Sequence, residues 1–241
     1  MSLHFESTGD GPLTIVLTHG LAASTGTWAA QVEELSARHR VLTWDLRGHG
    51  RSGGPAGAYA LHDLAGDLRE VLDRAGVERA VVLGHSAGGV VAMQFALDHP
   101  ERTAGLVLVG TASECNTRAR DFYEDLAKIA EERGMAPVFR RLGLGDQGAA
   151  KPGADPVAFA KVARCMASLH EAPLTPRLGE IRCPTLIIVG DKDFLGAGGS
   201  VILSRCIAGS VLHIVPERGH GIFLEDPAGF NRLVDEFLRG I

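Results

Sequence analysis

Six short apolar runs, separated by stretches with helical spacing, constrain the fold more than any other feature of the sequence. They span residues 13–18, 40–44, 80–83, 105–109, 184–189 and 211–215. Most of them lack an alternation of apolar and polar residues, which is typical of strands buried on both faces of a parallel sheet. Residues 3–7, followed by a turn at residues 9–12, predict an additional edge strand. The series predicts an α/β fold with a mostly parallel central sheet flanked by helices.

The stretches between these runs carry apolar residues three and four positions apart. Trp28, Val32 and Leu35 share one helical face, and residues 61–72 and 230–238 show the same spacing. A face of this kind buries itself against a neighbouring layer. We therefore expect these three helices to pack on the sheet.

One interval between the runs is much longer than the others. About seventy residues separate Val109 from Pro184, more than a crossover helix requires. Within it, residues 122–130 and 156–169 have helical spacing, and Gly134 ends the first of these helices. The predicted organisation is an α/β core of residues 1–111 and 177–241, with a small helical cap formed by residues 112–176.

The composition bounds the class of protein and its partners. A chain of 241 residues is long enough for one domain with an insertion. Its net charge of −5 is spread along the chain, so no basic face is expected to bind nucleic acid or anionic lipid. Residues 1–6 lack the pattern of a signal peptide, and no apolar stretch approaches the ~20 residues that span a bilayer. We expect a cytoplasmic monomer or homodimer that acts on a small molecule.

The cysteines give no sign of a metal site or a disulfide framework. Cys115, Cys165, Cys183 and Cys206 are scattered, with no CxxC pair and no histidine at metal-ligand spacing. They are expected to serve as small apolar side chains. No metal and no organic cofactor is predicted.

A serine lies at a turn between an apolar run and a helix. Gly84, Ser86 and Gly88 form a G-x-S-x-G pattern there. A serine in a strained strand-to-helix turn projects its hydroxyl outward only if its neighbours carry almost no side chain. The same turn aims the amide of Ala87 and the positive end of the next helix at the space beside Ser86. The context predicts a nucleophile at Ser86 rather than a turn that only packs a helix on a strand.

Four further segments resemble the α/β-hydrolase superfamily. Residues 18–21 (Thr-His-Gly-Leu) resemble its oxyanion loop, and residues 45–52 resemble its D-x-R-G-x-G-x-S segment. Residues 190–193 match a G-x-x-D acid loop, and residues 219–227 are similar to the family's histidine loop. The resemblance covers nearly the whole chain. It implies the α/β-hydrolase fold and a catalytic triad in the order serine, acid, histidine.

A serine nucleophile needs a histidine that takes its proton. Of the ten histidines, His220 is preferred because it follows the final strand, at the sheet edge where Ser86 is expected. His19 is expected to brace its own loop through hydrogen bonds. His85 is expected to point away from the site, and His170 to face water.

The triad also needs a carboxylate that orients the histidine. The family pattern selects Asp193, whereas Asp191 is expected to accept hydrogen bonds from its own loop. Glu114 is a more distant rival, because some members of the fold carry the acid one strand earlier. Asp45 is a weaker rival, since the Asp45 and Arg47 pair is expected to tie its own loop together.

Two backbone amides are predicted to form the oxyanion hole. One belongs to Ala87, after the nucleophile, and the other to Leu21, after the His-Gly pair. Removing one donor from such a hole typically costs about 3 to 4 kcal/mol of transition-state stabilisation.

The resemblance is strongest to small esterases and 3-oxoadipate enol-lactonases. It implies a serine hydrolase that cleaves a small carboxylic ester or lactone through an acyl-enzyme on Ser86. The serine argues against haloalkane dehalogenases and epoxide hydrolases, whose nucleophile is aspartate. Carbon-carbon bond hydrolases, thioesterases and perhydrolases share the triad and stay open as alternatives. So does a low-turnover ligand receptor of the same fold.

Two groups of side chains give weaker hypotheses about the substrate, and the first is a set of arginines in the predicted cap. Arginines that either bind an acidic substrate or form a solvated face are Arg118, Arg120, Arg140, Arg141 and Arg164. Apolar residues that either line an acyl pocket or form core are Phe122, Met135, Phe139, Met166 and Phe223.

Overall fold

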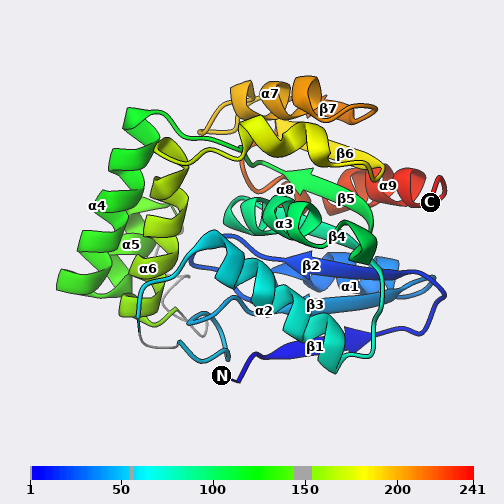
Figure 1. Cartoon of the computed structure of the whole chain (residues 1–241), viewed down its shortest axis with the longest axis horizontal. Helices are drawn as coiled ribbons and strands as arrows, with labels where there is room; N and C mark the ends of the chain where they lie inside the picture. Colours follow the sequence, from blue (N-terminus) through cyan, green and yellow to red (C-terminus); the bar gives the residue numbers. More distant parts are fainter. Residues whose placement is uncertain (1, 55–56, 144–153) are drawn as a thin grey trace.

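A seven-stranded sheet forms the centre of the molecule (Figure 1). The computed structural model describes residues 2–54, 57–143 and 154–241. The strands are β1 (Phe5–Thr8), β2 (Thr14–Thr18), β3 (Arg40–Trp44), β4 (Ala80–His85), β5 (Thr103–Val109), β6 (Thr185–Gly190) and β7 (Val211–Val215). Their order is β1-β3-β2-β4-β5-β6-β7. Only β1 pairs antiparallel, with β3, so the predicted mostly parallel sheet is confirmed.

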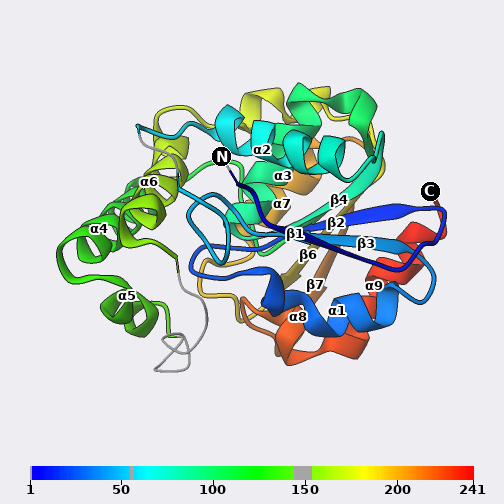
Figure 2. The ribbon, with the colours of Figure 1, turned by 90° about the horizontal axis from the view of Figure 1, so that it is seen from below.

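Helices cover both faces of the sheet, which explains why its inner strands read as uninterrupted apolar runs (Figure 2). One face is covered by α2 (Leu61–Arg74), α3 (Ala87–Asp98) and α7 (Gly198–Cys206). The other is covered by α1 (Ala29–Leu35), α8 (Ile222–Glu225) and α9 (Pro227–Leu238). Short 3-10 turns occupy Thr25–Trp28, Pro100–Arg102, Ser168–His170 and Thr175–Glu180.

The last strand departs from the buried pattern. β7 pairs only with β6 and lies at the edge of the sheet. Val211 and Ile214 are consequently 51% and 48% exposed, although the apolar run resembles those of the inner strands. The run predicted the strand correctly but not its exposure.

Three helices lie together beside the sheet, at the left of Figure 1. They are α4 (Thr117–Arg133), α5 (Met135–Arg141) and α6 (Pro156–Ala167). Leu126, Val138 and Phe159 are fully buried in a small hydrophobic cluster that these helices share. Side-chain caps start two of the helices, since Asn116 accepts from the Ala119 amide and Asp155 from the Ala158 amide. Part of the predicted cap, residues 144–153, lies outside the described residues, and the cap boundaries stay a prediction.

One cap helix was not predicted from the sequence. Gly134, with φ of +74°, ends α4 as expected, but the chain resumes at once as α5. Pro137 makes this stretch look non-helical. In the first turn of a helix, however, a proline loses no intrahelical hydrogen bond, because the amides there have no partner. Among the described residues, no helix combines the length and apolar character needed to cross a bilayer.

Candidate active site

Ser86 occupies a strained turn between β4 and α3. Its φ is +54° and its ψ is −120°, a conformation that costs about 1 to 3 kcal/mol for a residue with a side chain. The turn is held at both ends of the residue. The Ser86 amide donates to the Val109 carbonyl at 2.9 Å, and the Ser86 carbonyl accepts from the Gly89 amide at 2.9 Å.

The two glycines of the motif are required by close backbone contacts. A Cβ atom on Gly84 would lie 2.1 Å from the Gly88 carbonyl oxygen. A Cβ atom on Gly88 would lie 2.3 Å from the Thr18 carbonyl oxygen. Neither position can accept a side chain without displacing backbone, so the turn depends on both glycines.

His220 and Asp193 form a buried pair on neighbouring loops. The Nδ1 atom of His220 lies 2.9 Å from the Oδ2 atom of Asp193. The Asp193 side chain is 1% exposed and that of His220 is 19% exposed. Because the carboxylate is the acceptor, the proton of the neutral imidazole belongs on Nδ1, which leaves Nε2 as a base. Gly110 allows this approach, since a Cβ atom there would lie 3.0 Å from Asp193 Oδ2.

Ser86 and His220 line the same cavity, of about 150 Å³, together with Gly20 and Leu21. No hydrogen bond joins Ser86 to His220 in the part of the chain that the structure describes. The structure therefore brings the candidate nucleophile and base to one cavity without joining them. Hydrogen bonds of this kind often tighten only in the complex with substrate.

The acid loop distinguishes its two aspartates clearly. Asp193 Oδ1 accepts the amide of Leu195 at 2.8 Å, in addition to the contact with His220. Asp191 is exposed, and among the described residues its carboxylate approaches only Lys192, at 3.8 Å between Oδ2 and Nζ. The expectation that Asp191 accepts backbone hydrogen bonds in its loop is wrong, because Asp193 is the residue that does so.

Asp45 stabilises two loops, neither of which is the acid loop of residues 190–193. Its buried carboxylate accepts the amides of Thr25 at 2.7 Å and Arg51 at 2.9 Å. Arg47 does not pair with it. The guanidinium instead makes two hydrogen bonds to Asp67 on α2, at 2.6 and 2.7 Å. The expected Asp45 and Arg47 pair is thus wrong, although Asp45 does tie its own loop through Arg51.

His19 braces its loop as expected. Nδ1 of His19 lies 2.7 Å from the Gly20 carbonyl oxygen, and Nε2 accepts the Leu46 amide at 3.0 Å. Complete burial lowers the pKa of His19 to about 4, so the ring is neutral near pH 7. Nδ1 is then the donor to Gly20, because Nε2 already acts as an acceptor.

His85 and His170 differ from their predicted environments. Nε2 of His85 donates to the carbonyl of His220 at 3.0 Å, and the two ring centroids are 4.6 Å apart. Burial and the neighbouring His220 hold the pKa of His85 well below its usual range. His85 therefore supports the histidine loop rather than pointing away from the site. His170 is half-buried, with Nδ1 3.0 Å from the Cys115 carbonyl oxygen, rather than simply facing water.

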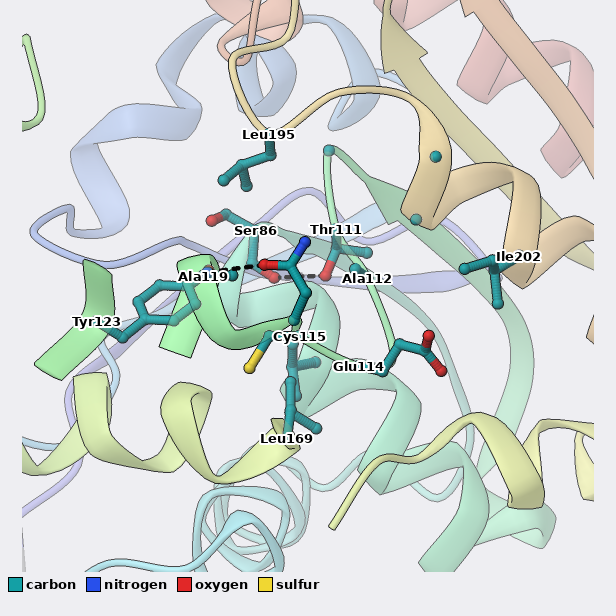
Figure 3. A pocket seen from close by; sticks show the side chains of 15 residues that line it. Ser86, Thr111, Ala112, Glu114, Cys115, Ala119, Tyr123, Leu169, Leu195 and Ile202 are labelled. Atoms are coloured by element: carbon teal, nitrogen blue, oxygen red, sulfur yellow. Dashed lines mark hydrogen bonds between the residues drawn. The ribbon is translucent and has the colours of Figure 1, made fainter. Parts of the chain in front are cut away.

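Both candidate oxyanion donors belong to peptides whose carbonyl group is fixed. The described peptide bonds are all trans, so a carbonyl and the amide that follows it point in opposite directions. His19 holds the Gly20 carbonyl and thereby sets the direction of the Leu21 amide. The hydroxyl of Thr111 donates to the Ser86 carbonyl at 2.8 Å (Figure 3). This hydrogen bond sets the direction of the Ala87 amide in the same way.

Two cavities meet at Ser86. The larger, of about 320 Å³, is lined by Ser86, Thr111 and Glu114 among others (Figure 3). The smaller is the one that contains His220. Tyr123 lines both cavities, and burial raises the pKa of its hydroxyl to about 12, so that group stays protonated.

The apolar residues proposed from the sequence to line an acyl pocket contribute unequally to these cavities. Phe122 and Phe223 line the smaller cavity, whereas Phe139 is buried outside the lining residues and Met166 belongs to the main core. Met135 packs against the cap cluster. The apolar spacing alone could not separate these roles, because a pocket wall and a core face have the same pattern.

None of the five cap arginines lines either cavity at Ser86. Arg164 makes two hydrogen bonds to Glu131, each of 2.7 Å, and Arg120 pairs with Asp121. Arg118 and Arg141 line an outer cavity of about 560 Å³. Arg140 is exposed.

Thr111, Tyr123 and Leu195 were missed by the sequence reasoning. Thr111 had a usable signal, because it is a polar residue just beyond the carboxyl end of β5, where parallel strands converge on a site. Tyr123 had none, since its place beside Phe122 is equally typical of core. Glu114, considered only as a rival acid, lines the larger cavity and accepts a hydrogen bond from the Thr175 hydroxyl at 2.5 Å.

Comparisons with known proteins agree with this arrangement. A family model described as the alpha/beta hydrolase fold matches residues 14–132. RutD of Variovorax paradoxus, named as a putative carbamate hydrolase, is 33% identical over 257 residues, which cover 99% of this chain and 96% of that protein. The chain belongs to the α/β-hydrolase family.

Solved structures of other hydrolases superpose on this one over nearly its whole length. The enol-lactonase from Burkholderia xenovorans LB400 is 27% identical, with a TM-score of 0.87, and the match covers 98% of this hydrolase and 96% of that chain. A thermophilic esterase from Thermogutta terrifontis is 30% identical, with a TM-score of 0.86 and coverage of 99% and 93%. Within the described residues, this hydrolase has four free cysteines and no cluster of three side chains able to hold a metal ion.

Proposed function

We propose that this hydrolase cleaves a small carboxylic ester or lactone through an acyl-enzyme on Ser86. One observation carries the proposal. Ser86 stands in a strained turn and faces the same cavity as His220, whose other ring nitrogen is held by the buried carboxylate of Asp193. Strain at a residue whose hydroxyl faces a cavity is typical of nucleophiles, and a turn that only packs a helix does not need it.

The first half of the reaction forms the acyl-enzyme. Nε2 of His220 takes the proton of the Ser86 hydroxyl while the oxygen attacks the substrate carbonyl carbon. The amides of Leu21 and Ala87 bind the resulting oxyanion. The intermediate then collapses, the bond to the alcohol oxygen breaks, and His220 gives its proton to that oxygen.

The second half regenerates the enzyme. Water attacks the acyl carbon, His220 takes its proton, and the carboxylic acid leaves as the proton returns to Ser86. Asp193 keeps the neutral ring in the required tautomer and stabilises the imidazolium that forms in each half. The chemistry needs these side chains and water, with no cofactor in any step.

A second candidate function is the hydrolysis of a carbamate. It is favoured by the similarity to RutD, which extends over 99% of this chain. A carbamate carbonyl passes through the same kind of tetrahedral intermediate, so the same residues would serve. Carbon-carbon bond hydrolases, thioesterases and perhydrolases also use such a triad, and a ligand receptor would keep it with little turnover.

A substrate panel tests the proposed function. We expect sustained, multiple-turnover hydrolysis of activated esters and small lactones, measured as product release under steady-state conditions. Higher kcat/KM on a matched carbamate would favour the second candidate. Release of one equivalent of product, with no further turnover, would support a receptor and contradict the proposed enzyme.

Thr111→Val is expected to lower kcat/KM for ester hydrolysis about fivefold to tenfold, since it removes one hydrogen bond worth about 1 kcal/mol or slightly more. The valine side chain would keep the methyl group beside Gly89 but could not donate a hydrogen bond to the Ser86 carbonyl. The inhibition constant of a trifluoromethyl ketone, which binds as an oxyanion, should weaken by the same factor. Thr111→Ser keeps the hydroxyl and is the matched control. Equal losses in both variants would show that Thr111 acts only through packing.

A further inference from the structure

Of the two cavities at Ser86, only the smaller is lined by His220. The smaller contains His220 and Leu21, and the larger contains neither. In the proposed reaction His220 must give its proton to the leaving alcohol. The leaving group therefore belongs in the smaller cavity, and the acyl group belongs in the larger one.

The larger cavity is built mainly from apolar and small residues. Val90, Leu169 and Ile202 contribute to its walls, and Figure 3 shows Leu169 and Ile202 on different sides of it. Its volume of about 320 Å³ falls within the range of small-ligand pockets. It is the larger of the two cavities at Ser86 and has room for a short acyl chain.

The charge in this cavity has one sign. Among its described lining residues, Glu114 is the one acidic residue, and no lysine, arginine or histidine lines it. Cys115 is neutral, because burial raises the pKa of its thiol. In Figure 3 the Glu114 carboxylate lies apart from Ser86, on the side of Ile202.

Glu114 is anchored in place by its neighbours. Its Oε2 atom accepts the Thr175 hydroxyl at 2.5 Å, and the Thr175 oxygen also lies 2.7 Å from that of Ser113. No cation pairs with Glu114 within the described residues. Arg120, whose charge acts on the neighbouring Cys115, makes its hydrogen bonds to Asp121. The acyl cavity thus keeps an uncompensated negative charge.

We propose that Glu114 biases acyl specificity toward an acyl chain that ends in a cationic ammonium group and against one that ends in a carboxylate. This inference rests on the proposed acyl-enzyme. It differs from the hypothesis that cap arginines bind an acidic substrate, since those arginines lie outside the cavity. Because Glu114 is exposed, its effect is limited to about fivefold for each unit of substrate charge and weakens as salt is added.

The test uses phenyl esters of three acyl groups. They are 5-(trimethylammonio)pentanoate, its uncharged carbon isostere 6,6-dimethylheptanoate, and adipate bound through one carboxyl group. We expect wild-type kcat/KM to be about fivefold higher for the cationic ester than for the neutral one, and lower still for the anionic ester. Raising the ionic strength should reduce both differences.

Glu114→Gln should remove the differences in kcat/KM among the cationic, neutral and anionic esters. The cationic ester should fall to the level of the neutral ester, the anionic ester should rise, and the neutral ester should stay within about twofold of wild type. Glu132→Gln, an exposed position on α4 outside both cavities, is the control and should keep the wild-type order. An unchanged charge preference in Glu114→Gln, or equal losses on all three esters, would overturn the assignment of Glu114.

Failure of the proposed function gives a different result. In that case wild type would not turn over the neutral ester, or Ser86→Ala would hydrolyse it as fast as wild type. Either outcome would overturn the acyl-enzyme and this inference together. A loss of charge preference alone would overturn only the role of Glu114.

Discussion

Ser86→Ala is expected to lower kcat for ester hydrolysis by about a million-fold, the loss typical when one member of a triad that acts as a unit is removed. Neither neighbour of Ser86 in the turn, His85 or Ala87, carries a hydroxyl that could replace it. The backbone hydrogen bonds of Ser86 do not involve its side chain, so the fold should persist. The measurement is kcat on an activated ester, with a thermal unfolding curve for each protein.

Ser210→Ala is the matched control for this substitution. The Ser210 hydroxyl donates to the Ser204 carbonyl near the end of α7 and lines neither cavity at Ser86. Its activity should equal that of wild type. Retention of more than a few per cent of wild-type turnover in purified Ser86→Ala would count against the nucleophile assignment.

Asp193→Asn is expected to reduce kcat about ten-thousandfold, whereas Asp191→Asn should stay within about twofold of wild type. The amide group can present its NH2 to Nδ1 of His220, which stabilises the tautomer that cannot act as the base. The buried carboxylate of Asp193 accepts the Leu195 amide through Oδ1 and contacts His220 through Oδ2. Asp191 is exposed and pairs with the exposed Lys192, so its charge is screened by solvent.

Both variants should be measured for kcat/KM on the same ester. One residue, Lys192, separates the two positions, and both substitutions replace the same carboxylate by an amide in the same loop. Equal losses in the two variants would mean that Asp193 is not the acid of the triad.

The sequence was most informative where local pattern determines structure. Apolar runs without alternation predicted every inner strand to within two residues, because burial on both faces leaves no polar positions. The turn at Ser86 was recognisable for a related reason. Its glycines are required because a Cβ atom at either position would lie under 2.5 Å from a backbone oxygen, and a requirement of this kind is visible in the sequence.

Long-range side-chain partners were less predictable. His85 donates to a carbonyl 135 positions away, and Arg47 pairs with an aspartate on α2 rather than with Asp45 in its own loop. Such partners depend on how loops and helices pack, which periodicity does not encode. The same holds for Thr111 and Glu114, whose roles became visible only when the cavities did.

Burial keeps two histidines near the site, His19 and His85, in the neutral form. Burial lowers the pKa of His19 to about 4, and that of His85 lies well below its usual range. A protonated His19 could no longer accept the Leu46 amide through Nε2. The loop that carries the Leu21 amide thus depends on a neutral ring, held by one donated and one accepted hydrogen bond.

Formation of a covalent intermediate on Ser86 is tested most directly by reaction with a fluorophosphonate, followed by peptide mass spectrometry. The predicted result is one adduct per chain, located on Ser86, with labelling absent in Ser86→Ala and much slower in His220→Ala. An adduct on another residue would contradict the nucleophile assignment. Labelling of Ser86 at an undiminished rate in His220→Ala would contradict the assignment of the base.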